Sequence, residues 1–275
     1  MRVKELTVIL FFVLAVGAFG DAGLEIIVED NPSGLTIVSS KGNVSTLDIP
    51  ETINGRPVTV IGNNAFTSKG LLEVTIPSTV TRIGNGAFAF NYLRSVTLGD
   101  NVTEIGIGAF TGNRLATVSL GSSVAIIGKG AFSNNRITGI TIPADVTAIA
   151  DYAFFNNRIR EITIPERVTS IGEGAFSGNR LLSIEIGSGV TTIGDGAFYN
   201  NQITVVTIPP SLETLGKRAF DIRNTDGRIR GNAVYTDVAG NVLYTAANNF
   251  NGAFDANGRR PGRYTFSDGN WTLND

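Results

Sequence analysis

Apolar residues recur along most of the chain with a period of 22 residues. An Ala-Phe pair marks each repeat, and an Ile or Leu precedes each Phe by five residues. A short fixed period of this kind is the signature of a solenoid, in which each coil buries its apolar face against its neighbours. The pattern predicts eight coils, whose pairs are Ala65-Phe66, Ala87-Phe88, Ala109-Phe110, Ala131-Phe132, Ala153-Phe154, Ala175-Phe176, Ala197-Phe198 and Ala219-Phe220.

Each repeat contains one segment with strand character. Residues 93–98 read L-x-x-V-x-L, and β-branched residues dominate the alternating part of the copies. Such strands, one coil apart, are expected to pair in parallel. A Pro or Gly ends each strand. A second Gly follows the Ile or Leu that lies five residues before each Phe, in every coil except at Ala150. The rest of the coil is too short for a helix, so we expect turns or 3₁₀ pieces there. The copies are 71–76, 137–142, 159–164 and 203–208.

A column of asparagines follows the Phe column at a distance of three residues. A polar residue that recurs at a coil corner is expected to bond loop backbone, because buried amides require partners. The column is Asn91, Asn113, Asn135, Asn157, Asn179 and Asn201.

The N-terminus, residues 1–20, is typical of a signal peptide. Arg2 and Lys4 precede an 11-residue apolar run at 6–16, and small residues follow at Ala18 and Gly20. The run is short for a membrane span, which takes about 20 residues. We expect cleavage near Asp21, with an uncleaved signal anchor as the alternative. The protein is then exported to the periplasm, the cell surface or the medium, with no span in the mature chain.

The solenoid is predicted over 49–220, with a five-residue insertion in its first unit. Residues 21–48 are expected to form a β cap: a hairpin of 35–38 and 44–47 around a turn at 39–42. Residues 221–275 break the period and read as a β-rich cap. Its expected strands include 234–235, 241–244 and 264–266, with turns at 239–241 and 267–269.

The amino-acid composition excludes most common classes of catalytic site. The chain has no His and no Cys, which excludes Ser-His-Asp and Cys-His nucleophiles, structural zinc sites and disulfides. A net charge of −2 gives no reason to expect nucleic acid. The acidic residues Asp151, Glu173 and Asp195 share one turn position with Lys129 and Lys217, which argues against a calcium ladder. We therefore expect no cofactor and no metal.

The pattern L-x-x-I-x-I-P-x-x-V-x-x-I-G-x-x-A-F-x-x-N-x resembles the BspA-like, or treponemal-type, bacterial leucine-rich repeats over about 49–220. The resemblance implies a leucine-rich-repeat solenoid with a parallel β-sheet on one face, short turns or 3₁₀ pieces on the other, and small β caps. It also implies a cell-surface or secreted protein that acts in adhesion to host matrix or other cells. The C-terminal stretch with Trp271 looks like the end module of related spirochaetal repeat proteins.

A candidate binding face follows from two rows of residues. One row precedes each strand, and its arginines would lie about 5 Å apart in successive coils. That spacing costs about 1 kcal/mol per adjacent pair in water, so we expect Glu161 and Glu185 to neutralise part of the charge. The row is either a solvated face or a guanidinium stripe for carboxylate or sulfate groups of a protein or glycan. The candidate residues are Tyr92, Arg94, Arg114, Arg136, Arg158, Arg160 and Arg180, with the outward strand positions Thr141, Thr163 and Glu185.

Three functions remain in view. The first is a non-enzymatic binding or adhesion protein that engages host matrix proteins, cells or glycans through the repeat surface. The second is a structural or envelope-organising repeat protein without a host partner. The third, a glycan hydrolase, requires two carboxylates about 5–10 Å apart in a cleft, and no aperiodic acidic pair stands out.

Overall fold

The computed structural model describes residues 9–13, 24–220, 232–236, 242–247, 254, 257–267 and 270–274. The chain forms two compact units, residues 1–136 and 137–275, and each is described by itself. The expected signal peptide lies outside the described residues except for Ile9–Val13, which form strand β1 and pair antiparallel with β2 (Leu24–Asn31). No helix among the described residues is long and apolar enough to span a membrane.

The first unit begins with a hairpin of β2 and β3 (Gly34–Lys41), so the predicted hairpin of 35–38 and 44–47 is wrong. Leu24, Ile26 and Val28 alternate into the core, which makes the residues before 35 a strand in their own right. The segment β4 (Thr46–Asp48) instead pairs in parallel with β7 (Glu73–Thr75), so it belongs to the first coil.

The insertion in the first coil forms a small hairpin of its own. β5 (Thr52–Ile53) pairs antiparallel with β6 (Arg56–Ile61). The connecting residues Asn54 and Gly55 have φ of 51° and 73°, the left-handed values that a two-residue hairpin turn requires.

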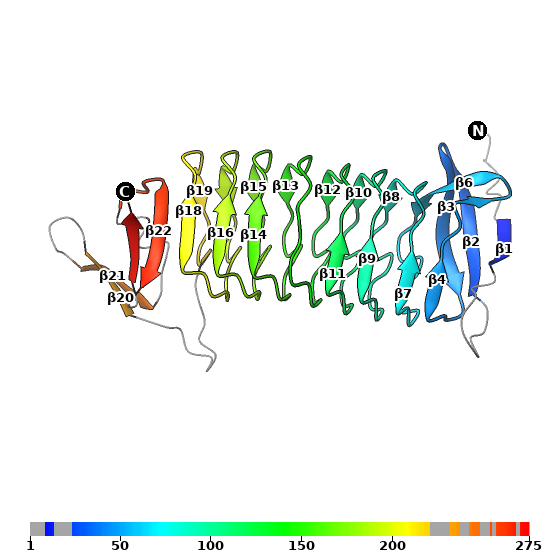
Figure 1. Cartoon of the computed structure of the whole chain (residues 1–275), viewed down its shortest axis with the longest axis horizontal. Coiled ribbons are helices and arrows are strands. Elements are labelled where there is room, and N and C mark those ends of the chain that lie inside the picture. Colours follow the sequence, from blue (N-terminus) through cyan, green and yellow to red (C-terminus); the bar gives the residue numbers. More distant parts are fainter. Residues whose placement is uncertain are drawn as a thin grey trace, which may run out of the picture. The chain divides into compact units, whose positions relative to one another are not determined.

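Two parallel ladders run through the coils of the first unit (Figure 1). In the first ladder, β3 pairs with β6, and the two-residue strands that follow one coil apart are called the inner strands. In the second ladder, three-residue strands pair one coil apart, and these are called the outer strands. The inner run continues through β8 (Arg82–Ile83), β10 (Glu104–Ile105) and β12 (Ile126–Ile127), and the outer strands include β9 (Ser95–Thr97) and β11 (Thr117–Ser119).

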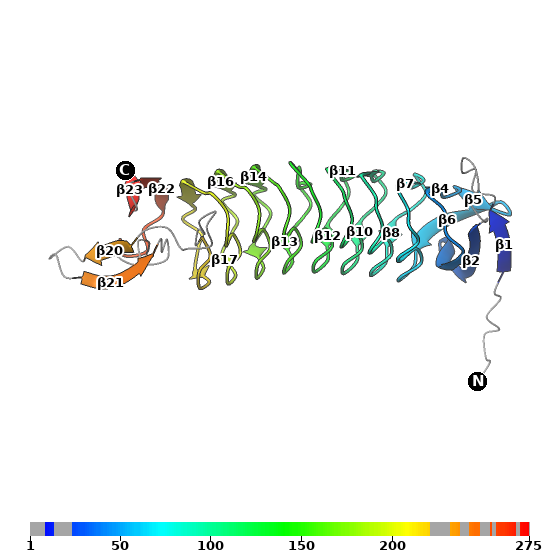
Figure 2. The same cartoon turned by 90° about the horizontal axis from the view of Figure 1, so that it is seen from below.

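The second unit repeats this arrangement, and successive coils lie side by side in Figures 1 and 2. An antiparallel pair at the C-terminal end, β22 and β23, continues the outer ladder beyond β18. The inner strands are β13 (Ala148–Ile149), β15 (Ser170–Ile171), β17 (Thr192–Ile193) and β19 (Thr214–Leu215). The outer ones are β14 (Glu161–Ile164), β16 (Ser183–Ile186), β18 (Val205–Ile208), β22 (Gly262–Ser267) and β23 (Asn270–Asn274), and a separate hairpin joins β20 (Asn232–Thr236) to β21 (Val242–Ala247).

The strand predicted over 137–142 is absent from the described structure of this unit. Gly139 offers no side chain to pack on a sheet face, and glycine weakens strands. The bond from Arg160 N to Thr138 O is accordingly long at 3.4 Å, against 3.0 Å for the equivalent bond from Leu182 N to Arg160 O. The predicted turns at 239–241 and 267–269 fall almost wholly outside the described residues.

The core of each unit is a column of stacked phenylalanines. In the first unit the rings of Phe66, Phe88, Phe110 and Phe132 follow one another at 5.3–5.4 Å between centroids, and all are fully buried. In the second unit Phe154, Phe176, Phe198 and Phe220 stack at 5.1–5.5 Å. Burying one such side chain contributes about 1.5–3 kcal/mol, so the column is a main source of stability.

The asparagine column acts as predicted, as a ladder that ties adjacent coils. Asn179 lies buried; its Nδ2 donates to Phe154 O and Phe176 O, both at 2.9 Å. Its Oδ1 accepts the amide of Ile159 at 3.1 Å. The side chain therefore supplies partners to buried backbone of two coils, and the other asparagines of the column make corresponding bonds.

The stretch between the inner strand and the Phe consists of tight turns, without 3₁₀ pieces, in the repeat region 49–220. In every coil, the residue two before the Phe is left-handed, which prevents a helical continuation. The column is Asn64, Gly86, Gly108, Gly130, Tyr152, Gly174, Gly196 and Arg218, with φ of 55–61°. Glycine occupies this conformation without strain, whereas Tyr152 and Arg218 are bulky residues there.

Candidate functional site

The structure places the candidate arginines at equivalent corners of successive coils. In the second unit, Arg158 N donates to Ile137 O and Arg180 N donates to Ile159 O, each at 2.9 Å. These repeated bonds hold the two residues one coil apart, and both side chains are exposed. Arg160 and Arg180 line a hollow of about 250 Å³ together with Leu182 and Gln202. We call Arg158, Arg160 and Arg180 the arginine surface.

The carboxylates expected to neutralise this surface do not do so. Among the ion pairs of the described residues, none involves the arginine surface. Glu185 contacts Thr163 instead, with the hydroxyl 3.4 Å from its carboxylate. Glu161 lines the hollow of Thr163 and Glu185, whereas Arg160 lines the separate hollow that it shares with Arg180. The surface therefore carries guanidinium groups that remain open to an anion.

The first unit holds the remaining members of the row. Arg114 N donates to Leu93 O at 3.0 Å and Arg136 N donates to Leu115 O at 2.9 Å, so both occupy the same corner as in the second unit. The Arg114 guanidinium lies 4.4 Å from the centroid of the exposed Tyr92 ring, a cation–π contact. Arg94 and Arg136 are exposed.

Thr163 and Glu185 lie on the outer sheet of the second unit, and Thr141, which is not in a strand, lines the same hollow. Thr141, Thr163 and Glu185 are all exposed and line one hollow of about 580 Å³. Thr163 and Glu185 are register partners in the pairing of β14 with β16. The sequence therefore identified a group of neighbours here.

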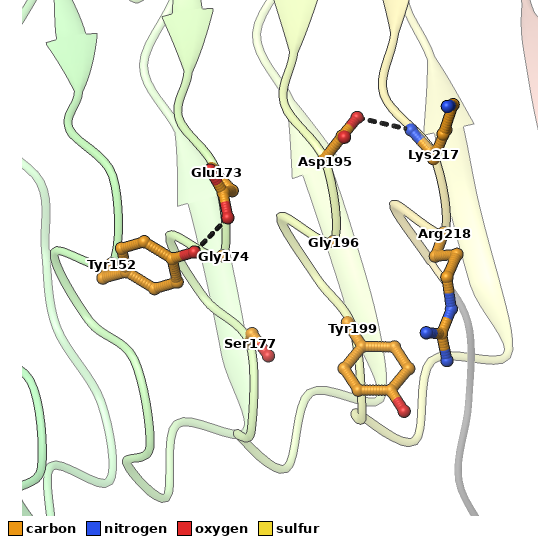
Figure 3. A pocket seen from close by; sticks show the side chains of 9 residues that line it. All are labelled: Tyr152, Glu173, Gly174, Ser177, Asp195, Gly196, Tyr199, Lys217 and Arg218. Atoms are coloured by element: carbon orange, nitrogen blue, oxygen red, sulfur yellow. Dashed lines mark hydrogen bonds between the residues drawn. The ribbon is translucent and has the colours of Figure 1, made fainter.

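Sequence reasoning missed a third hollow, which lies over the left-handed column of the second unit (Figure 3). It has a volume of about 380 Å³. Tyr152 donates a hydrogen bond to Glu173, and this bond raises the pKa of the Tyr152 hydroxyl. Glycine stands two residues before the Phe in most coils, but Tyr152 and Arg218 replace it at the two ends of this hollow, so the glycine spacing alone does not mark it. We call it the aromatic trough; its residues are Tyr152, Glu173, Gly174, Ser177, Asp195, Gly196, Tyr199, Lys217 and Arg218.

Among the described residues, no group of three or more acidic side chains is arranged to hold a metal ion. The chemistry on offer at the three hollows is that of guanidinium, carboxylate, hydroxyl and aromatic groups, which suits non-covalent recognition.

Comparison with known proteins agrees with the geometry. The profile of the BspA type leucine rich repeat region matches residues 59–179 and 147–226, in six copies, which is more than half of the chain. No curated protein sequence matches.

One solved bacterial structure shares the fold with a TM-score above 0.5, and two others match with lower scores. A leucine-rich repeat protein of T. pallidum is 25% identical, with a TM-score of 0.53, over 62% of this chain and 83% of its own. One from Eubacterium ventriosum is 21% identical, with a TM-score of 0.40, over 76% of this chain and 68% of its own. A leucine-rich cell surface protein of Faecalibacterium prausnitzii is 20% identical, with a TM-score of 0.31, over 77% of this chain and 83% of its own.

Proposed function

Because the chain belongs to the BspA-type leucine-rich repeat family, we propose that it is an exported, non-enzymatic binding protein that engages an acidic protein or glycan through its arginine surface. The observation that carries this proposal is the set of exposed guanidinium groups, positioned by coil-to-coil bonds and without an ion pair among the described residues. Guanidinium binds carboxylate and sulfate in a planar, two-point geometry, so an unpaired row of them suits ligands with repeated acidic groups.

A direct test compares binding of two charge-matched double variants. Arg160→Ala/Arg180→Ala removes two members of the arginine surface. Arg82→Ala/Arg167→Ala removes two arginines that already pair, with Glu104 and Asp145, and serves as the control. Both variants are screened against immobilised matrix proteins, sulfated glycans and components of the producer's own envelope.

We expect the first variant to lose at least tenfold in affinity for the captured ligand and the control to stay within about threefold. Equal loss in both variants would show that net charge alone drives binding. Selective capture of the producer's own envelope would favour the structural alternative.

Export is tested separately. When the full chain is expressed in a bacterial host, we expect the exported product to begin near Asp21 by intact mass. A product that retains residues 1–20 in the membrane fraction would support the signal anchor.

A further inference from the structure

We propose that the aromatic trough is a second binding site, which takes a short oligosaccharide with a carboxylated sugar at its Arg218 end. It shares no lining residue with the hollow beside Arg160 and Arg180, so the site is independent of the arginine surface. Its volume of about 380 Å³ falls within the range of small-ligand sites.

The trough is made by a departure from the repeat. Positions 152, 174, 196 and 218 are equivalent in four successive coils, and they read Tyr, Gly, Gly, Arg. All four are left-handed, with φ of 55–57°. The Tyr152 ring lies over Gly174, where an added Cβ would come within 2.5 Å of it, so the open floor is at Gly196. Tyr152 and Arg218 stand at either end, as Figure 3 shows.

Tyr152 and Arg218 adopt this conformation at an energetic cost. The left-handed region is unfavourable for an ordinary residue relative to the right-handed one, because the Cβ comes close to the following carbonyl oxygen. Glycine fills the same position in most other coils and would carry no such cost. Strain retained at both walls of one hollow points to a functional demand on those two side chains.

Aromatic surface lies beside opposite charges along the trough. The Arg218 guanidinium lies 4.5 Å from the centroid of the Tyr199 ring. The ring of Tyr152 packs edge-on against Phe155 at 5.9 Å, which orients it. The carboxylates, Glu173 and Asp195, come from the middle coils, and the cations, Lys217 and Arg218, from the last.

This arrangement matches a sugar chain in two respects. The C–H face of a pyranose packs on an aromatic ring, because its polarised hydrogens meet the negative face of the π system. A guanidinium that stacks on a ring keeps its N–H donors in its own plane, the direction from which a sugar carboxylate binds. Hydroxyl groups of a neutral sugar can donate to Glu173 and Asp195.

A peptide strand suits the trough poorly. The amides of Tyr152, Gly174 and Gly196 donate to carbonyls of the next coil, at 2.8–3.0 Å. These donors are used within the solenoid and cannot pair with an added strand, which is how extended peptides gain affinity at a sheet edge.

The test is calorimetric titration of the full chain with hyaluronate and oligogalacturonate hexasaccharides and with sialyllactose, against chitohexaose as the neutral probe. We expect at least one acidic probe to bind at least tenfold more tightly than chitohexaose. Binding by none of the acidic probes at millimolar concentration, or equal binding of the neutral one, overturns the proposal.

The diagnostic variant is Gly196→Asn, which fills the floor. Asn64 shows that asparagine adopts this backbone conformation in this chain, with φ of 57°. An added Cβ at Gly196 meets only the Cβ of Tyr199, at an ordinary 3.5 Å. We expect at least a tenfold loss of affinity, while the matched variant Gly108→Asn, at the same position of another coil, keeps wild-type affinity.

Tyr199→Ala should lose at least tenfold, and Tyr199→Phe, which keeps the ring, should stay within about threefold. If Gly196→Asn binds like the wild type while Arg160→Ala/Arg180→Ala loses the glycan, the sugar sits on the arginine surface and the trough proposal fails. If Gly196→Asn loses the glycan while Arg160→Ala/Arg180→Ala binds it like the wild type, the trough proposal stands, and the arginine surface is tested by the ligand screen described above.

Discussion

Replacing Asn179 by alanine tests the coil-to-coil ladder. The buried side chain makes three hydrogen bonds, to Phe154 O and Phe176 O and from Ile159 N. A typical buried hydrogen bond has a net value of about 0.5–1.5 kcal/mol, so their joint removal should cost about 2–4 kcal/mol. The loss should concentrate in the two coils that the side chain joins, because solenoid stability is a sum of contributions from neighbouring repeats.

Guanidinium chloride unfolding of the wild type, Asn179→Ala and the neighbouring exposed control Arg180→Ala measures the global effect. We expect the control to stay within about 0.5 kcal/mol of the wild type. Amide hydrogen exchange measures the local effect, with Ile159 N–H losing protection in Asn179→Ala alone. Asn179→Ala that matches the control, with Ile159 still protected, would refute the reasoning.

Three further predictions follow from single features. Gly130→Ala should lower the free energy of unfolding by about 1 kcal/mol through its left-handed backbone conformation alone, because the added Cβ meets only Ser133 Oγ at 3.6 Å. Gly130→Asn should lower it by less, and equal losses in the two variants would contradict the backbone explanation. Phe176→Ala should cost about 3–5 kcal/mol in denaturant unfolding, because it leaves a gap in a stacked column, and a cost under 1 kcal/mol would contradict the packing. The hydrogen bond to Glu173 raises the pKa of Tyr152 above 10.0, so this bond stabilises the fold below pH 10.0 and is lost as the pH rises through the raised pKa. Glu173→Gln should therefore lower the pKa of one tyrosine in an ultraviolet titration. An unchanged titration curve would contradict the link.

The repeat architecture could be predicted from the sequence because it depends on which side chains recur at each position of the coil. A Phe at every twenty-second position must be buried, and a corner Asn must bond backbone, so both columns could be predicted. The N-terminal hairpin was misplaced by one strand because residues 44–47 and 35–38 have similar alternation, and only the pairing of 46–48 with 73–75 shows to which coil they belong.

The aromatic trough could not be found in this way. Left-handed conformation is a property of the backbone, and Tyr152 and Arg218 conceal it because neither residue type favours it. The arginine surface was predicted as a row, but the absence of a carboxylate partner for it among the residues that the structure describes depends on side-chain directions that spacing alone does not give.

The most direct test of the proposed binding function is to observe the arginines themselves during ligand binding. Nuclear magnetic resonance of the side-chain Nε–H groups, recorded while the full chain is titrated with the acidic ligand captured in the screen, reports each arginine separately. The account predicts that the Arg158, Arg160 and Arg180 signals shift in a saturable way, while those of Arg82 and Arg167 stay in place. Saturable binding that leaves the first three signals unmoved would contradict it.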